Sequence, residues 1–257
     1  MSSDQLPYGP PADQEPPELP LADCETKEPL PLGRMFGSCT LAYVLVQVGL
    51  AILASLVGAP YLLTVLIASG GSVLAIFAVL ILWYNVLERR VSISTMLTLG
   101  QADSRDLSDG AVTGFVCLMA VIAITIPMNL ILHHFGQEVP PHDFIKLLSG
   151  GPFAVVGVYV AAVVIAPIGE EILFRRLLYC GLDQRIGPIG AMWVTCLVFA
   201  VIHTKLTHLL PLAVVAFLLQ KLYLRKRNLF SCMVAHAVFN GCQLTMALLF
   251  LEHGAAQ

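Results

Sequence analysis

The chain consists mainly of long apolar runs separated by shorter polar stretches. A helix needs roughly 20 apolar residues to cross a bilayer, and seven runs come close to that length. The runs are Phe36–Val57, Leu62–Leu87, Val112–Leu132, Pro152–Leu182, 188–203, Leu206–Leu224 and Leu229–Leu251. This pattern predicts an all-α, polytopic membrane helix bundle with about seven transmembrane helices.

Glycine, proline and polar residues mark the connections between these runs. The sequence Gly58-Ala59-Pro60 predicts a tight turn after the first run, and Gly187-Pro188 begins the fifth. The longer connections, residues 88–110 and 133–151, are polar, and we expect them to be loops.

The first 33 residues differ in composition from the rest of the chain. Residues 1–32 hold eight of the 16 prolines, seven acidic residues and a single lysine. Such a segment has too little apolar surface to fold, so we expect a disordered, acidic cytoplasmic tail. Three regions follow from this division: the tail at 1–33, N-terminal transmembrane helices and loops at 34–151, and a C-terminal helical region at 152–251.

Composition agrees with a membrane location. Apolar residues make up 57% of the chain and charged residues 12%, against about 25% charged in soluble domains. Membrane lipid is therefore the expected surrounding. Outside the membrane flanks the sequence has no basic patch of the size that nucleic acid requires, so we expect no nucleic-acid partner.

The basic residues indicate an orientation, because cytoplasmic flanks are enriched in lysine and arginine. With the N-terminus in the cytoplasm, 12 of the 14 lysines and arginines lie on the cytoplasmic side. Only Lys146 and Lys205 then lie outside. We therefore expect a cytoplasmic N-terminus in a multi-pass protein of the plasma (inner) membrane.

Two adjacent carboxylates, Glu170 and Glu171, interrupt the fourth apolar run. An ionisable residue within a membrane segment is costly and is therefore a functional-site candidate. Glu171 and Arg175 are four residues apart and can pair on one helix face. Glu170 points about 100° away from that face. It has no basic residue three or four positions later, so it remains available for chemistry.

Three more polar residues occur in the apolar runs that follow: His203, His236 and Asn240. The last two are four residues apart and share a helix face. Measured from the cytoplasmic ends at 1.5 Å per residue, these residues and Glu170 lie at similar depths, roughly 12 to 23 Å. Because unsatisfied polar groups in lipid must find partners, we expect one intramembrane site rather than scattered packing contacts.

These polar residues form three short motifs in a fixed order on successive apolar runs. The motifs are Glu-Glu-x-x-x-Arg at Glu170, Glu171 and Arg175, Phe-x-x-x-His at Phe199 and His203, and His-x-x-x-Asn at His236 and Asn240. In this order they resemble the CPBP intramembrane endopeptidases, also called the ABI or CAAX-protease-like family, which include the type II CAAX prenyl endopeptidases. The resemblance covers residues 153–250. The chain departs from the family pattern at Arg176, where many members have glycine, and in having seven predicted spans instead of eight.

The resemblance implies a function and a set of residue roles. It predicts a catalytic core formed by the four C-terminal helices, and hydrolysis of a peptide bond in a membrane-associated, prenylated CAAX-type substrate. Glu170 would act as general base on a water that His203 also holds. His236 and Asn240 would donate hydrogen bonds to the oxyanion. Glu171 and Arg175 would support the site.

Other chemistries and functions remain open at the level of sequence. Glu170, His203 and His236 are also a possible ligand set for a catalytic zinc ion, although the chain has no His-Glu-x-x-His motif and the family resemblance favours catalysis without a cofactor. A non-catalytic peptide-binding, immunity or accessory protein of the same family is the main alternative function. A small proton-coupled transporter is a further one, but no internal repeat supports it.

Overall fold

The computed structural model describes residues 31–58, 60–86, 103–137, 147–203 and 206–255. All of the regular elements within these ranges are helical, which confirms the predicted fold class. The predicted tail lies outside the described residues except for its last three positions. Of these, Leu32 and Gly33 already belong to the first helix.

The helices follow the predicted apolar runs closely. The elements are α1 (Leu32–Val57), α2 (Tyr61–Val86), α4 (Ser104–His134), α6 (Pro152–Tyr159), the π-helix η1 (Val160–Ile165), α7 (Ala166–Glu171), the π-helix η2 (Ile172–Tyr179), α8 (Cys180–Ile202), the 3-10 turn η3 (Leu206–His208), α9 (Leu209–Lys226) and α10 (Leu229–Ala255). The elements α6, η1, α7, η2 and α8 follow one another without a loop, but the backbone at Gly187 is not helical and divides this run into two arms. It bends sharply at Gly187, where φ is 75° and ψ is 168°.

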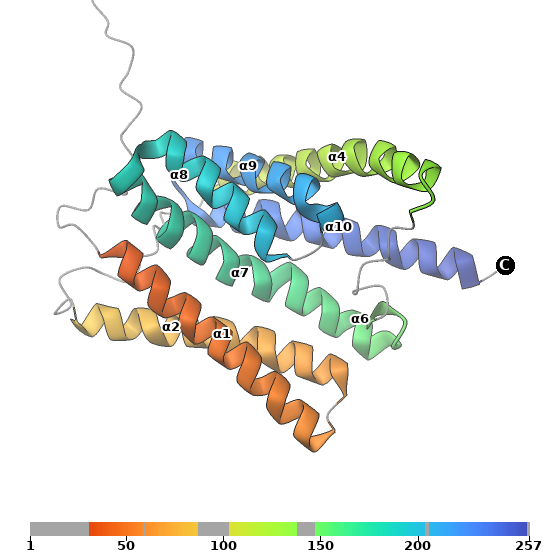
Figure 1. The fold of residues 1–257 in the computed structure, drawn as a ribbon, viewed down its shortest axis with the longest axis horizontal. Helices are drawn as coiled ribbons and strands as arrows, with labels where there is room; N and C mark the ends of the chain where they lie inside the picture. Colours follow the sequence, from red (N-terminus) through yellow and green to blue (C-terminus); the bar gives the residue numbers. More distant parts are fainter. Residues whose placement is uncertain (1–30, 59, 87–102, 138–146, 204–205, 256–257) are drawn as a thin grey trace, which may run out of the picture.

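The segments alternate in direction along the length of the molecule (Figure 1). The start of α1, the bend of α8 and the α9–α10 turn lie at one end of the bundle, and the C-terminus lies at the other. Arg34, Arg185 and Arg227 belong to segments at this first end. Arg175 and Arg176, which the sequence placed among the cytoplasmic basic residues, are instead buried in the bundle.

Within the part of the chain that the structure describes, five helical segments are long and apolar enough to cross a membrane. They are Leu32–Val57, Leu63–Asn85, Ser104–His134, Pro152–Ile202 and Leu229–Leu251. The count is lower than the predicted seven for two reasons. The predicted fourth and fifth spans meet at the Gly187 bend, as the sequence predicted, and together make up Pro152–Ile202. The second arm, residues 188–202, extends only roughly 22 Å. Helix α9 contains Lys221, Arg225 and Lys226 within its 18 residues, which is too many charges for a plain lipid-facing span.

Helix α4 begins eight residues earlier than predicted, so the predicted loop at 88–110 is wrong for residues 104–110. Asp103 and Asp106 form a reciprocal cap: the Asp106 N–H donates to the Asp103 side chain at 2.7 Å, and the Asp103 N–H donates to Asp106 Oδ2 at 3.2 Å. Residues 88–102 of the predicted loop lie outside the described residues, and Asp103 is the N-cap of the helix.

Asp106 also ties the start of α4 to the α9–α10 turn. Its carboxylate accepts hydrogen bonds from Asn228 at 3.0 Å and Ser231 at 3.2 Å, and it lies 3.0 Å from Lys226 Nζ. Lys226 also lies 2.9 Å from Asp109. Hydrogen bonds to Asp109 and Asp106 raise the pKa of Lys226 above its usual value. This cluster fixes the first turn of α10, the helix that carries His236 and Asn240.

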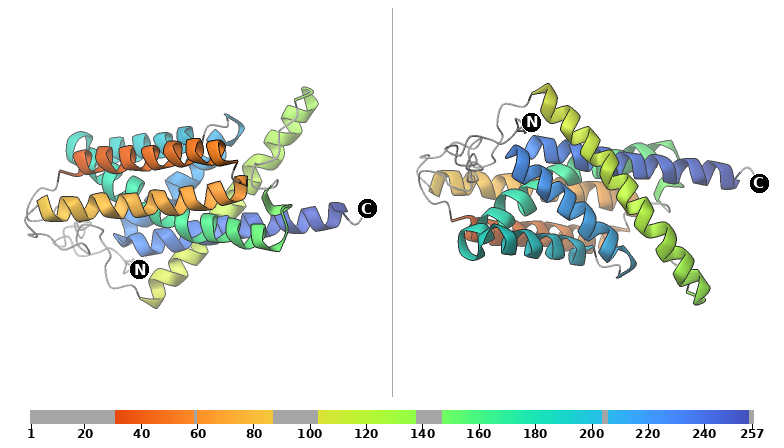
Figure 2. Two further views of the ribbon diagram at one scale, coloured as in Figure 1. Left: turned by 90° about the horizontal axis from the view of Figure 1, so that it is seen from below. Right: turned by 90° about the horizontal axis from the view of Figure 1, so that it is seen from above.

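Helices α4 and α10 cross at close range, as Figure 2 shows for the two long helices. Gly110 and Gly114 face α10 four residues apart. A Cβ atom at Gly110 would lie 2.7 Å from the Ser231 carbonyl oxygen, and one at Gly114 would lie 2.5 Å from that of Ala235. Small residues at this spacing let two helix backbones approach each other. The contact at Ala235 sets the position of the neighbouring His236.

We predict that Gly114→Ala lowers the stability of the protein by about 1 to 3 kcal/mol, because the added methyl group overlaps the α10 backbone. The shift in α10 should also displace His236. Melting of the detergent-solubilised protein measures the effect. Gly37→Ala is the matched control, since a Cβ atom there meets nothing within 4 Å. Equal melting temperatures for the Gly114 variant and the wild type would contradict the close crossing.

Candidate active site

The helix that carries the two glutamates is widened on both sides of them. Residues Val160–Ile165 and Ile172–Tyr179 are π-helical. Pro167 explains the first of these segments, because proline has no N–H to donate and its ring clashes with the carbonyl four residues earlier. A π-turn relieves the clash and rotates the residues that follow it around the helix axis. The direction in which Glu170 points therefore depends on this segment.

Asn240 completes the hydrogen bonding of the widened turn. In an α-helix the Ala162 carbonyl would accept from the N–H of Ala166, but that N–H donates to Ala161 instead. In a π-helix the donor would be residue 167, which is proline. The Asn240 side chain provides the missing donor, with Nδ2 2.7 Å from the Ala162 oxygen. One of the two N–H groups of Asn240 is thus used to hold the helix.

Glu171 lies at the centre of a buried polar cluster. Its side chain is 0% exposed, and its Oε1 atom accepts from Arg175 Nη1 at 3.0 Å. The predicted pair with Arg175 is therefore confirmed. The same oxygen lies 2.8 Å from Nδ1 of His236. Because an ionised carboxylate can only accept, Nδ1 carries the proton in this contact and Nε2 faces the other way.

Arg175 connects this cluster to two further helices. Its Nη2 atom lies 3.4 Å from the Ala216 carbonyl of α9, and its guanidinium lies over the Phe199 ring of α8, 5.1 Å from the centroid. Phe199 is 1% exposed. Its ring also contacts those of His203, at 4.8 Å, and His236, at 6.1 Å, so Phe199 packs against the polar residues of the site.

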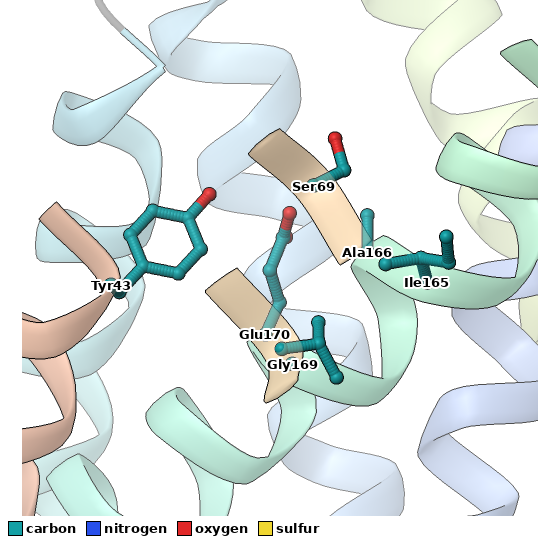
Figure 3. Close-up of a pocket in the computed structure, with 7 residues that line it drawn as sticks. Tyr43, Ser69, Ile165, Ala166, Gly169 and Glu170 are labelled. Atoms are coloured by element: carbon teal, nitrogen blue, oxygen red, sulfur yellow. The ribbon is translucent and has the colours of Figure 1, made fainter. Parts of the chain in front are cut away.

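Glu170 has different surroundings from its neighbour. Its side chain is 20% exposed, and its Oε2 atom lies 3.9 Å from Nε2 of His236. Within the described part of the chain, Oε2 has no hydrogen-bond partner. The carboxylate borders a small cavity of about 30 Å³ (Figure 3), which has room for at least one water molecule. Tyr43, Ser69, Val73, Ile165, Ala166 and Gly169 form the rest of its lining.

His203 is the C-cap residue of α8 and lies beside Phe199. Its Nδ1 atom lies 2.7 Å from the Phe199 carbonyl oxygen, which leaves Nε2 as the nitrogen that could reach a substrate. His203 contacts residues of its own helix, Phe199 and Ala200, whereas His236 contacts both glutamates. The structure thus gathers Glu170, Glu171, Arg175 and His236 tightly, and holds His203 and Asn240 at the edges of the group.

The zinc alternative required Glu170, His203 and His236 as ligands. In the described ranges, no three His, Cys, Asp or Glu side chains lie close enough together to hold a metal ion. Asn240, the remaining polar residue, donates to a backbone carbonyl.

Sequence reasoning missed two contributors to the site. Pro167, three residues before Glu170, was visible as a proline inside an apolar run and could have predicted the interrupted helix. Tyr43 had no local signal, because its relation to Glu170 depends on how α1 packs across the bundle. Arg176, the departure from the family pattern, is completely buried.

The carbonyl of Ala162 gives a test of how Asn240 acts. Asn240→Ala should destabilise the protein by about 1 to 3 kcal/mol, because a buried acceptor loses its donor. In a Pro167→Ala background the helix regains an N–H, so the same substitution should cost much less. The measurement is a double-mutant cycle on unfolding of the detergent-solubilised protein.

Asn85→Ala is the control for this cycle, because the Asn85 side chain also donates to a helix carbonyl, that of Ile81, at an exposed position within a regular helix. Its effect should not depend on Pro167. Strict additivity of the Asn240 and Pro167 substitutions would show that the two residues do not serve the same carbonyl.

The comparisons with known proteins agree with this geometry. Residues 152–242 match the family model described as "Type II CAAX prenyl endopeptidase Rce1-like". A curated relative, named "Putative membrane peptidase YdiL", from Bacillus subtilis (strain 168), is 25% identical over 151 residues. The match covers 58% of this chain and 60% of that relative. No solved structure matches the chain. The matched segment contains every motif residue from Glu170 to Asn240, so the C-terminal part of this multi-pass membrane protein is similar to the type II CAAX prenyl endopeptidases.

Proposed function

We propose that the protein is an intramembrane endopeptidase that hydrolyses a peptide bond of a membrane-associated substrate with water activated by Glu170. The observation that carries this proposal is the unequal placement of two adjacent glutamates. Glu171 is buried and bound by Arg175 and His236. Glu170 borders a cavity with room for water, and its Oε2 atom is close to a histidine nitrogen. A general base needs such a position within reach of the proton that it takes.

In the proposed reaction, Glu170 removes one proton from the water while the water oxygen attacks the carbonyl carbon of the substrate. The carbonyl oxygen becomes an oxyanion. The C–N bond then breaks as the proton taken by Glu170 passes to the leaving amine. The second proton of the water is released when the new carboxyl group ionises. Hydrolysis therefore yields one carboxylate and one amine. No group beyond the protein and water is required.

His236 is suited to share the proton with Glu170. Because its Nδ1–H donates to Glu171, its Nε2 atom presents a lone pair toward Glu170 Oε2. At 3.9 Å this is longer than a hydrogen bond, and catalytic hydrogen bonds often tighten only when substrate binds. Glu171 would stabilise the imidazolium that forms. This differs from the sequence-based role of His236 as an oxyanion donor alone.

His203 and Asn240 are our candidates for contacts with the substrate carbonyl. Asn240 keeps one N–H beyond the one that holds Ala162. In His203 the Nδ1–H donates to the Phe199 carbonyl, so Nε2 can donate only when the ring is an imidazolium. Positioned donors of this kind stabilise the oxyanion of acyl transfer. Substitution of His203 also tests the sequence-based proposal that this residue holds the catalytic water.

The substrate we propose is a membrane-associated peptide, and a prenylated CAAX tail is the first candidate because the matching family model carries that description. The basic end of the bundle, where α1 begins, would face the cytoplasm. We propose the plasma membrane as the location, with the scissile bond presented from the cytoplasmic side.

The two glutamates should respond differently to the same substitution. Glu170→Gln keeps the shape of the side chain and removes the base, so cleavage should fall by about 10²- to 10⁴-fold or more with normal melting. Glu171→Gln leaves Arg175 without its carboxylate partner in a buried site, which should cost about 3 to 5 kcal/mol of stability. Melting temperature and cleavage of a farnesylated CAAX peptide are measured for each purified variant.

The reverse pattern would contradict this assignment. An active Glu170→Gln variant, together with an inactive Glu171→Gln variant that melts normally, would make Glu171 the base. Full biological function without measurable cleavage in the Glu170→Gln variant would instead favour a non-catalytic peptide-binding protein.

Chelation tests the proposed chemistry without a cofactor. If Glu170 activates water directly, cleavage of the same peptide should continue at the wild-type rate after thorough treatment with EDTA and 1,10-phenanthroline. Loss of activity that stoichiometric zinc restores would reassign Glu170 and the two histidines as metal ligands.

A further inference from the structure

The cavity at Glu170 extends beyond the segment that matches the family model. Residues 152–242 supply Glu170 and three other lining residues, but Tyr43 comes from α1, and Ser69 and Val73 come from α2. The polar groups of this wall are the hydroxyls of Tyr43 and Ser69. Both are therefore candidates for a role that the motif residues do not reveal.

Tyr43 occupies an unusual place on its helix. Its neighbours Leu41 and Leu45 are 60% and 61% exposed, as expected for residues that face lipid. The Tyr43 ring turns inward instead, and in Figure 3 it lies beside Glu170, with its hydroxyl directed toward the space above the carboxylate. The Gln47 side chain hydrogen-bonds the Tyr43 hydroxyl. The hydroxyl proton can still be donated to a polar occupant of the cavity, since a phenolic O–H both donates and accepts.

The three polar groups of the cavity match the needs of one water molecule. The Ser69 hydroxyl donates to the Val65 carbonyl at 2.8 Å, so its oxygen faces the cavity as an acceptor. The Glu170 carboxylate, which borders the cavity, is a second acceptor. Tyr43 is the donor. A buried water needs two to four polar partners, and one that donates to Glu170 and Ser69 while it accepts from Tyr43 has three.

We propose that Tyr43 is a positioning residue of the active site, whose hydroxyl orients the water that Glu170 activates. This inference rests on the proposed function for its catalytic part only. The hydrogen bond from Tyr43 occupies one lone pair of the water, and the proton transferred to Glu170 lies on the opposite side. The second lone pair is then left to attack the substrate carbonyl. The α1–α2 hairpin thus completes the site formed by the motif helices.

A double-mutant cycle tests the shared water without any substrate. Tyr43→Phe and Glu170→Gln are made singly and together, and the unfolding equilibrium of each detergent-solubilised variant is measured by SDS titration. If both side chains hold one water, the two effects on the unfolding constant should be non-additive by about 3- to 10-fold. Tyr159→Phe is the control, because the Tyr159 hydroxyl bonds Thr245 at 2.8 Å and its effect should add to that of Glu170→Gln.

A kinetic measurement tests the catalytic part. Tyr43→Phe should lower kcat for the farnesylated CAAX peptide by roughly tenfold with KM unchanged, because the lost hydrogen bond acts on the water and not on the peptide. Coupling together with this loss of kcat supports the proposal. Additive unfolding effects overturn it, and so does coupling with unchanged kcat.

The two proposals can fail separately. If the wild type cleaves no peptide, the proposed endopeptidase function fails. The unfolding cycle then still decides whether Tyr43 and Glu170 hold a common water.

Discussion

One carboxylate oxygen, Oε1 of Glu171, organises the centre of this membrane protein. It accepts from Arg175 on its own helix and from His236 on α10. Arg175 in turn reaches the backbone of α9 and the Phe199 ring of α8. Removing charged groups from water costs several kcal/mol per ion unless they pair well. The last four helical segments therefore pack in the arrangement that keeps this group of charges together.

The different surroundings of Glu170 and Glu171 follow from this constraint. Once Glu171 is bound to its partners, its neighbour must point elsewhere on the helix, toward α1 and α2. The π-turns on either side set that direction, and the Asn240 contact with Ala162 maintains the first of them. The α4–α10 glycine contact and the Asp106 cluster hold α10 at the height where His236 reaches both carboxylates. Packing far from the cavity thus determines the geometry within it.

Hydropathy and spacing predicted much of this arrangement. The apolar runs located the helices, because lipid-exposed segments must be long, apolar and hydrogen-bonded internally. The four-residue spacing predicted the Glu171–Arg175 pair, and similar depth predicted that His236 would meet the glutamates. The predicted start of α4 was wrong because the Asp103–Asp106 cap extends the helix into polar sequence. The partner of Asn240 could not be predicted, because a π-turn changes which residues face a neighbouring helix. The part played by Tyr43 depends on contacts between distant segments, which spacing alone does not contain.

The central claim is that Glu170 makes this protein a peptidase within the membrane. It is tested most directly by expressing the wild type and Glu170→Gln at equal levels in the same cells and comparing the peptide ends in their membranes by quantitative mass spectrometry. We expect a set of new peptide ends that are present with the wild type and absent with Glu170→Gln. The same set of ends with both proteins would contradict the claim.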